Sequence, residues 1–362
     1  MVYTVGDTFT DPGATATDDT DGDLTDSITV SGTVDTSATG TYTLEYSVED
    51  AAGNSSSTSR TVVVNFGIAC TPTTIYSDPN QYFLNMFKTS SGSYIIRTLS
   101  GVYSSTSISG PFTDLGFNYP TTNQAHSLLG ENSQGEIFAA SPNDGIFKYS
   151  NGTWNSVGLS GFGTGGGNFL KLSNGRLILS KKGFLRKMYY SDDDGSTWTA
   201  ASGDIAEDWH HIVSLNDNLF TSSAGVQNKG GVIMSSDNGS SWTKVRDQQT
   251  YAIRKYDGEL YIISEDGSRG SGVYKLFKSS DNGQNWILLS DLPNNVMGIF
   301  IIHNDTIILK SYLGDYYCKN INNLDSSWNL FGTEEDLGNS SLDMNFIDNT
   351  PLIYTNTQII TF

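Results

Sequence analysis

The chain has 362 residues, of which 20 are Lys or Arg and 39 are Asp or Glu, giving a formal net charge of −19. A protein this acidic, without a basic patch, is not expected to bind nucleic acid or an anionic membrane surface. No apolar run approaches the length that spans a bilayer. Charged residues make up only 16% of the chain, and Ser, Thr, Asn and Gly are abundant, which favours an all-β extracellular or virion-surface protein over a cytosolic enzyme.

The first five residues do not form a secretory signal peptide. Met1–Val5 lacks both the basic start and the apolar core of such a segment. We therefore expect either a chain trimmed from a longer secreted protein, or one that reaches its surface by another route, as phage structural proteins do.

Residues 1–66 differ from the rest in composition, because they contain eleven acidic residues and a single basic one, Arg60. Apolar and polar residues alternate in Thr41–Val48 and again in Arg60–Val64, which predicts β-strands separated by turns rich in Asp, Gly and Ser. Several short strands within about 65 residues favour a small β-sandwich.

This segment also resembles a known repeat. The stretches Asp11–Ala16, Gly40–Tyr42, Asp50–Asn54 and Arg60–Val62 are similar to the bacterial Ig-like repeats of large surface proteins. The resemblance implies an Ig-like domain over residues 1–66. The first strand typical of that family is missing before Val2, which agrees with trimming or with a strand supplied from elsewhere.

The densest group of carboxylates in the chain lies in this segment and comprises Asp18, Asp19, Asp21, Asp23 and Asp50. Ca²⁺ takes six to eight oxygen ligands, and loops of alternating Asp can supply them. The spacing lacks the Glu and the loop length of an EF-hand. Two interpretations stay open: a calcium site, or a solvated acidic turn that keeps the domain soluble.

The two cysteines, Cys70 and Cys318, do not define a disulfide framework by themselves. The simpler expectation is two unpaired thiols. The alternative is a disulfide between them.

A turn pattern recurs in the second part of the chain. Ser-x-Asp-x-Gly-x-x-Trp occurs as Ser191–Trp198, Ser235–Trp242 and Ser279–Trp286, and the tryptophans are evenly spaced (242 − 198 = 44 and 286 − 242 = 44). We expect the Asp to accept hydrogen bonds from backbone N–H groups two residues on, the Gly to take a positive φ, and the Trp to pack between neighbouring sheets. Weaker copies place Phe112, Trp154 and Trp328 at similar intervals.

A period of 40–50 residues with several short strands per unit is typical of β-propeller blades. The pattern resembles the Asp-box (BNR repeat) of sialidase-type propellers, and this resemblance implies that the turns fasten blades on the side away from the binding face. The C-terminal unit, residues 342–362, has only three strand-like pieces. We therefore expect Thr73–Ser77 to supply its fourth strand, and residues 67–362 to form a seven-bladed propeller.

On the opposite face, the loops that lead into each first strand and those that join second to third strands would meet at the mouth of the central channel. Exposed aromatic and cationic groups there suit a glycan or a protein partner; the alternative is that the rings serve blade packing and the lysines solubility. Adjacent His210 and His211 point to opposite faces of a strand, which disfavours zinc. The candidate ligand-binding residues are Asp208, Trp209, His210, Tyr119, Lys181, Arg186, Arg254 and Arg97.

The resemblance to sialidases also implies a testable enzyme pattern: three arginines, a Tyr–Glu nucleophile pair and an Asp acid. Arg97 lies in Tyr94–Leu99, which lacks the Pro of the family's Arg-Ile-Pro motif, and the sequence does not pair Glu265 with any tyrosine. We therefore predict a non-catalytic recognition or adhesion module at a cell or virion surface. A sialidase-like glycoside hydrolase is the first alternative, and a structural module of a large adhesin or filament is the second.

Overall fold

The computed structural model describes residues 1–4, 7–38, 40–65, 72–117, 127–141, 144–159, 167–181, 187–204, 209–223, 230–265, 272–293, 296–311, 313–322, 324, 328–333, 340–355 and 357–361. The chain forms two compact units, Met1–Ala69 and Cys70–Phe362, whereas the sequence suggested a boundary after residue 66. Within the described ranges, no helix has the length and apolar character needed to cross a bilayer.

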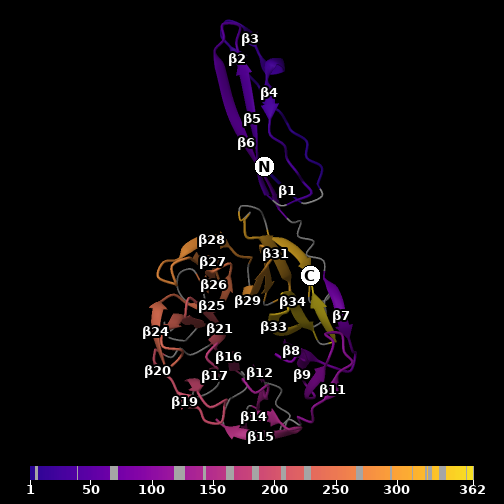
Figure 1. Ribbon diagram of the computed structural model, residues 1–362, viewed down its shortest axis with the longest axis vertical. Helices are drawn as coiled ribbons and strands as arrows, with labels where there is room; N and C mark the ends of the chain where they lie inside the picture. The colour runs from indigo at the N-terminus through magenta and orange to yellow at the C-terminus, as the bar shows by residue number, and fades with distance from the viewer. Residues whose placement is uncertain are drawn as a thin grey trace. The chain divides into compact units, whose positions relative to one another are not determined.

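The first unit is built on one four-stranded sheet with the strand order β1-β6-β5-β4 (Figure 1). The two long strands β5 and β6 pair antiparallel, and β1 pairs parallel with β6. A two-stranded hairpin of β2 and β3 and one 3-10 turn precede β4. The elements are β1 (Val2–Thr4), β2 (Thr17–Asp18), β3 (Gly22–Asp23), η1 (Thr25–Ser27), β4 (Thr29–Ser31), β5 (Gly40–Glu49) and β6 (Ser55–Asn65).

One face of this sheet carries the core of the unit. Tyr46 and Val62 are buried, while their neighbours along each strand are exposed or half-buried, as strand alternation requires. The segment before β2 covers this face: Asp11 accepts hydrogen bonds from the Tyr46 hydroxyl and from Arg60 Nη1, both at 2.6 Å. Among the described residues, the second layer of the predicted sandwich is therefore an irregular segment with a short hairpin.

The second unit consists of seven successive sheets in the part of the chain that the structure describes, and Figure 1 shows them arranged in a ring. Numbered in chain order, they contain β8 (Phe83–Lys88), β9 (Tyr94–Thr98), β10 (Val102–Ser105), β11 (Thr113–Asp114); β12 (Ser127–Glu131), β13 (Ile137–Ser141), β14 (Gly145–Ser150), β15 (Thr153–Gly158); β16 (Gly167–Lys171), β17 (Leu177–Lys181), β18 (Lys187–Ser191), β19 (Thr199–Ala200); β21 (Trp209–Leu215), β22 (Asn218–Ser223), β23 (Gly231–Ser235), β24 (Ser241–Arg246); β25 (Thr250–Tyr256), β26 (Glu259–Glu265), β27 (Tyr274–Ser279), β28 (Ile287–Asp291); β29 (Val296–His303), β30 (Thr306–Ser311), β31 (Tyr316–Asn320), β32 (Asn329–Gly332); and β33 (Ser340–Ile347), β34 (Thr350–Thr355), β35 (Gln358–Thr361), β7 (Thr73–Ser77). The fourth sheet gains a short outer strand, β20 (Ser202–Gly203), parallel to β24.

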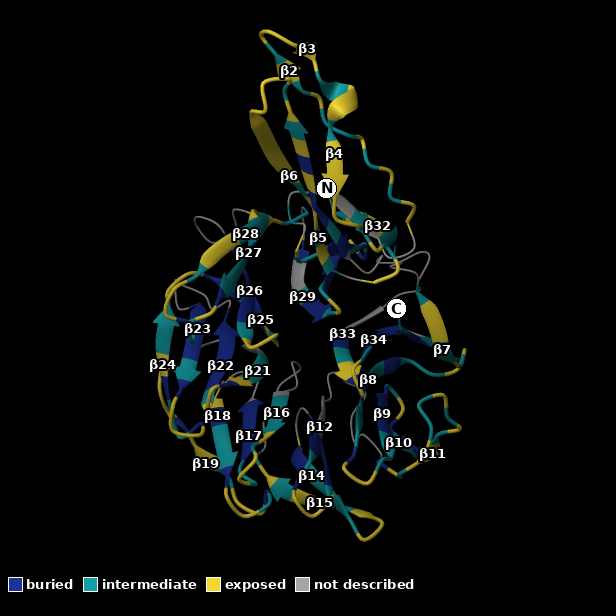
Figure 2. Ribbon diagram, turned by 45° about the horizontal axis from the view of Figure 1, so that its top comes forward, coloured by how far each residue is buried: buried dark blue, intermediate teal, exposed yellow. Residues whose placement is uncertain are grey.

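The predicted closing strand is confirmed. β7 pairs antiparallel with β35, with Tyr76 opposite Ile359 and Thr74 opposite Ile360. The seventh sheet then packs on the first, because Phe83 and Met86 share one buried cluster with Leu352 and Tyr354. Figure 2 shows that buried residues concentrate on the second strands of the sheets, such as β22 and β26. The pairing with β7 covers the edge of β35, which would otherwise be unpaired.

The three Ser-x-Asp-x-Gly-x-x-Trp turns share one set of hydrogen bonds, which differs from the expected one. In the second copy, Asp237 Oδ1 accepts from the N–H of Ser241 at 2.9 Å and Ser235 Oγ accepts from the N–H of Gly239 at 2.8 Å. The bonds therefore reach four residues on, and the prediction of two residues on is wrong. The reason is that Asn238 and Gly239 both have positive φ, 57° and 85°, which widens the turn.

The aromatic residues at the repeat positions pack between sheets, as predicted. Trp242 is 1% exposed and lies in one cluster with Ile178 and Met188 of the third sheet and Leu219 and Ile233 of its own. The equivalent contacts, each including residues of the preceding sheet, are made by Phe112, Trp154, Trp198, Trp286 and Trp328.

The two ends of the ring differ in construction. At the end that we call the turn end, first and second strands are joined by tight turns such as Asn216–Asp217 and Asn304–Asp305, in which both residues have positive φ, as hairpin turns require. The Ser-x-Asp-x-Gly-x-x-Trp turns lie at the same end. The opposite end, where the chain enters each first strand, we call the loop end.

Cys318 in β31 is disulfide-bonded and 2% exposed. The expectation of unpaired thiols is therefore wrong. Cys70, the other cysteine of the sequence, lies outside the described residues. A disulfide is typical of proteins that fold in an oxidising compartment.

Candidate functional site

The inner strands are irregular at the loop end. Within the described ranges, six of the seven inner strands shift register against their neighbour at their first or second residue, in β8, β12, β21, β25, β29 and β33. Such bulges re-aim side chains and are common beside binding and active sites. The loop end is therefore the candidate functional face.

A buried hydroxyl marks the loop end of each second strand. Ser264 Oγ donates to the carbonyl of Gln249 at 2.6 Å, Ser141 Oγ donates to Asp144 Oδ2 at 2.7 Å, and Ser311 Oγ accepts from the N–H of Asp315 at 3.0 Å. These bonds fix the bases of the loops that follow. The series was missed in the sequence, although it recurs with the repeat: Thr98, Ser141, Ser180, Ser222, Ser264, Ser311 and Thr355.

Glu265, at the loop end of β26, is the only buried carboxylate among the described residues. Its Oε2 accepts from the Tyr251 hydroxyl at 2.8 Å and its Oε1 accepts from the N–H of Gly272 at 3.2 Å. The Tyr251 ring meets the Tyr274 ring edge-on, with centroids 5.2 Å apart. Sequence reasoning named Glu265 without a partner; the Tyr251 contact depends on the register shift after Thr250, which no sequence pattern revealed.

The two arginines expected near the channel lie in different parts of the ring. Arg254 in β25 is 9% exposed, donates from Nη1 to the carbonyl of Ile253 at 2.8 Å, and stacks over the Phe300 ring. Arg97 in β9 is also buried. They belong to the fifth and first sheets, which are not neighbours in the ring.

The other predicted ligand-binding residues are placed only in part. Lys181 ends β17, and Trp209 and His210 begin β21, so that their backbones lie at the loop end; their side chains are outside the described part of the structure. Asp208, Tyr119 and Arg186 are wholly outside it.

Four of the five carboxylates considered for calcium, those of Asp18, Asp21, Asp23 and Asp50, accept hydrogen bonds from backbone N–H groups. Asp18 Oδ1 accepts from the N–H of Thr20 at 2.8 Å, and Asp50 Oδ1 accepts from the N–H of Asn54 at 2.7 Å. Hydrogen bonds from Asn54 lower the pKa of Asp50. The described residues contain no group of three or more His, Cys, Asp or Glu that could hold a metal. Calcium binding by Asp18, Asp19, Asp21, Asp23 and Asp50 stays a prediction, which calorimetric titration with Ca²⁺ would test.

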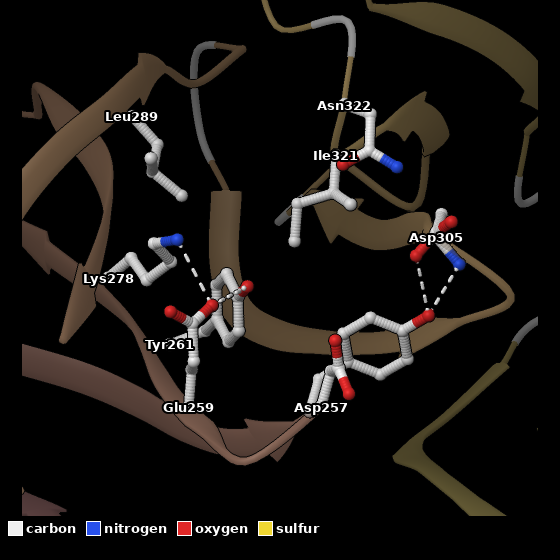
Figure 3. Close-up of a pocket in the computed structure, with 9 residues that line it drawn as sticks. Asp257, Glu259, Tyr261, Lys278, Leu289, Asp305, Ile321 and Asn322 are labelled. Atoms are coloured by element: carbon white, nitrogen blue, oxygen red, sulfur yellow. Dashed lines mark hydrogen bonds and ion pairs between the residues drawn. The ribbon is translucent and has the colours of Figure 1, made fainter. Parts of the chain in front are cut away.

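A pocket of about 140 Å³ lies at the turn end between the fifth and sixth sheets (Figure 3). Two bonded groups face each other across it. On one side, Glu259 Oε2 accepts from the Tyr261 hydroxyl and from Lys278 Nζ, each at 3.0 Å. On the other, the Tyr256 hydroxyl donates to Asp305 Oδ1 at 2.7 Å.

These contacts make the pocket a joint between sheets. Tyr256 belongs to the fifth sheet and Asp305 to the sixth, and the Tyr256 oxygen also accepts from the Asp305 N–H at 2.8 Å. Burial, reinforced by the hydrogen bond to Glu259, raises the pKa of Tyr261, so that it stays a neutral donor. These hydrogen bonds therefore fasten the fifth sheet to the sixth at the turn end, opposite the candidate functional face.

Comparison with known proteins supports the fold assigned to each of the two units. Residues 1–64 match the family described as "Bacterial surface protein, Ig-like domain". No curated protein sequence matches the chain.

Among solved structures, the extracellular domain of a one-component system from B. thetaiotaomicron has a TM-score of 0.59 at 12% identity, covering 81% of this chain and 40% of that one. YCF48 from Cyanidioschyzon merolae has a TM-score of 0.57 at 10% identity, covering 81% and 98%. PorZ, a surface component of the type-IX secretion system of Porphyromonas gingivalis, has a TM-score of 0.53 at 14% identity, covering 91% and 52%. The chain thus spans well under two thirds of the first of these proteins. It is an all-β chain that combines a bacterial surface Ig-like domain with a β-propeller fold.

Proposed function

We propose that this protein is a non-catalytic recognition module of a bacterial surface, in which the loop end of the propeller binds a glycan or a protein partner. The observation that carries the proposal is the contrast between the two ends of the ring. The turn end is held by repeated hydrogen-bonded turns, whereas six inner strands shift register at the loop end. Binding residues concentrate on irregular segments that a rigid scaffold positions.

The Ig-like match supports a surface location, and no comparison supports a virion. The residue types expected at the loop end, an indole, imidazoles and amines, suit stacking on sugar rings and hydrogen bonding to acidic glycans. Trp209, His210, Lys181 and Arg186, with Asp208 and Tyr119, remain the proposed contacts.

The experiment is a glycan array together with a pull-down of purified cell-surface proteins, using the full chain. Trp209→Ala and Lys181→Ala should each weaken binding at least tenfold. Lys255→Ala is the matched control, because Lys255 is an exposed lysine toward the turn end of β25. Binding that survives both loop-end changes, or that is lost in the control, would contradict the proposal. No binding in either format would favour the structural module.

A second function, sialidase-like glycoside hydrolysis, is favoured by one observation, the partly buried hydrogen bond from Tyr251 to Glu265. Against it stands the sequence around Arg97, which lacks the Pro of the Arg-Ile-Pro motif of sialidases. A fluorogenic sialoside assay decides between the two functions. Turnover that Glu265→Gln abolishes would establish the enzyme, and we expect no turnover in the unaltered protein.

A further inference from the structure

The pocket between the fifth and sixth sheets is large enough for the end of a long side chain from another protein. Its volume of about 140 Å³ is close to that of a cavity of about 150 Å³ that holds a benzene ring. Leu289 of β28 and Ile321 line it with half-buried apolar side chains. Tyr256 and Tyr261 add two aromatic rings to the lining, and Figure 3 shows these groups around one central space.

The lining carries three carboxylates and one ammonium group, so the pocket has a net negative charge. Lys278 pairs with Glu259 Oε2, and the Tyr256 hydroxyl donates to Asp305 Oδ1. Glu259 Oε1, Asp305 Oδ2 and both carboxylate oxygens of Asp257 have no donor among the described residues. Asp257 is exposed, Asp305 is half-buried and the Glu259 side chain is 26% exposed. A ligand can therefore reach all three carboxylates.

The arrangement of these carboxylates favours an organic cation over a metal ion. Figure 3 shows Glu259 and Asp305 on opposite sides of the pocket. No group of three or more His, Cys, Asp or Glu in the described ranges could hold a metal, so the three carboxylates do not form a metal site. A guanidinium group is planar and has five N–H donors, so it can donate to carboxylates on different sides at once. Aromatic rings such as those of Tyr256 and Tyr261 also attract cations.

Exposed apolar side chains lie on the outer strands of the same two sheets. Ile287 and Leu288 of β28 are 59% and 48% exposed, and Leu330 of β32 is 51% exposed. In the ladder of β27 and β28, Ile287 lies opposite Lys278, which lines the pocket, as does Leu289 further along β28. Protein interfaces are enriched in Arg, and they set an anchor in a pocket among surrounding apolar contacts. A small molecule would use the pocket alone, so the apolar side chains beside it indicate a protein.

We propose that this part of the turn end is a docking surface for a protein partner, whose arginine side chain enters the pocket and whose neighbouring apolar side chains pack on β28 and β32. The guanidinium donates to the free oxygens of Asp257, Glu259 and Asp305. The alkyl stem of the arginine lies against Leu289 and Ile321. The net charge of −19 favours the approach of a basic partner. This surface lies at the end of the ring opposite the loop end and is independent of the function proposed for that face.

The test uses the full chain and three capped tripeptides, in which two isoleucines flank arginine, its neutral isostere citrulline, or lysine. Binding is measured by isothermal titration calorimetry. The arginine peptide should bind in the millimolar range or more tightly, and less tightly as salt is added. The citrulline peptide should bind at least tenfold more weakly because it lacks the charge. The lysine peptide should also bind more weakly, because an ammonium group lacks the planar fork of donors.

Asp257→Asn should weaken binding of the arginine peptide by about threefold, within the range measured for exposed ion pairs, and adding Glu259→Gln should bring the loss to about tenfold. Asparagine tolerates the positive φ of residue 257, so the turn is retained. Asp217→Asn is the matched control, because Asp217 is an exposed residue with positive φ in the equivalent turn of the fourth sheet. This control should bind the peptide as the unaltered protein does.

The apolar part of the surface is tested by Ile287→Ser, which should weaken binding several-fold. Its control is Val30→Ser, since Val30 is a 50%-exposed apolar residue of the first unit. Thermal melts show whether each variant folds. Equal binding of the arginine and citrulline peptides, unchanged binding in folded Asp257→Asn with Glu259→Gln, or no binding of the arginine peptide in the millimolar range would overturn the proposal. Equal binding of the lysine peptide would overturn the assignment to arginine. Trp209→Ala should leave this binding unchanged, so that the failure of this proposal and that of the loop-end function are distinguishable.

Discussion

Replacing Trp242 by Ala tests the packing on which the ring depends. The indole is 1% exposed between the third and fourth sheets, and its Nε1 donates to the carbonyl of Gly239 at 3.1 Å. Burying about 150–250 Å² at ~25 cal/mol per Å² corresponds to roughly 4–6 kcal/mol. Measured Trp→Ala changes in cores are about 3–5 kcal/mol. We therefore expect the free energy of unfolding of the propeller to fall by about 3–5 kcal/mol.

The measurement is urea unfolding followed by far-UV circular dichroism, with the transition of the propeller fitted separately from that of the Ig-like unit. Trp198→Ala is the comparison: Trp198 occupies the equivalent position but is only half-buried, and its indole N–H has no hydrogen-bond partner among the described residues, so its loss should be smaller. A change below about 1 kcal/mol in Trp242→Ala, or a larger change in Trp198→Ala, would refute the assignment of Trp242 as the main inter-sheet contact of this repeat.

Three further predictions follow from single contacts. Gly239→Ala should destabilise the propeller by about 1–3 kcal/mol, because an added Cβ would lie 2.5 Å from Ile178 Cδ1. Gly258→Ala is the control: Gly258 has a similar positive φ but open space around the new atom, so this change should cost less free energy of unfolding in the same urea assay. Because Cys318 is disulfide-bonded, thiol titration of the denatured protein should detect no free thiol until a reductant is added, and reduction should lower the melting temperature. Hydrogen bonds from the backbone and side chain of Asn285 lower the pKa of Asp281 to about 2. The stability that this carboxylate contributes is therefore present above pH 4 and is lost as the pH falls toward 2. Asp281→Asn should flatten that part of the profile of melting temperature against pH, and an unchanged profile would contradict the stabilising role of the hydrogen bonds from Asn285.

Sequence reasoning succeeded where local chemistry repeats. The Trp spacing located the sheets, and the three-stranded end of the chain predicted the pairing of Thr73–Ser77 with β35, because the repeating unit has four strands and the last one lacked its fourth. Sequence reasoning failed on which backbone N–H group the Asp side chain of each turn accepts from. The two consecutive positive φ angles at Asn238 and Gly239 are not specified by the residue types alone. The free-thiol expectation for Cys318 failed because two cysteines 248 positions apart (318 − 70) give no local sign of proximity.

The candidate sites were harder to predict for a related reason. The Tyr251–Glu265 pair depends on a bulge, which changes which side chains share a face without changing the residue pattern.

The seam between the first and seventh sheets is held by polar bonds as well as by the apolar cluster. Asn345 Nδ2 donates to the carbonyl of Met86 at 2.6 Å, and Lys88 pairs with Asp348. These bonds join residues 259 and 260 positions apart in the chain. Because their partners come together only when the two ends of the propeller meet, these bonds stabilise the closed ring and contribute nothing to an open one.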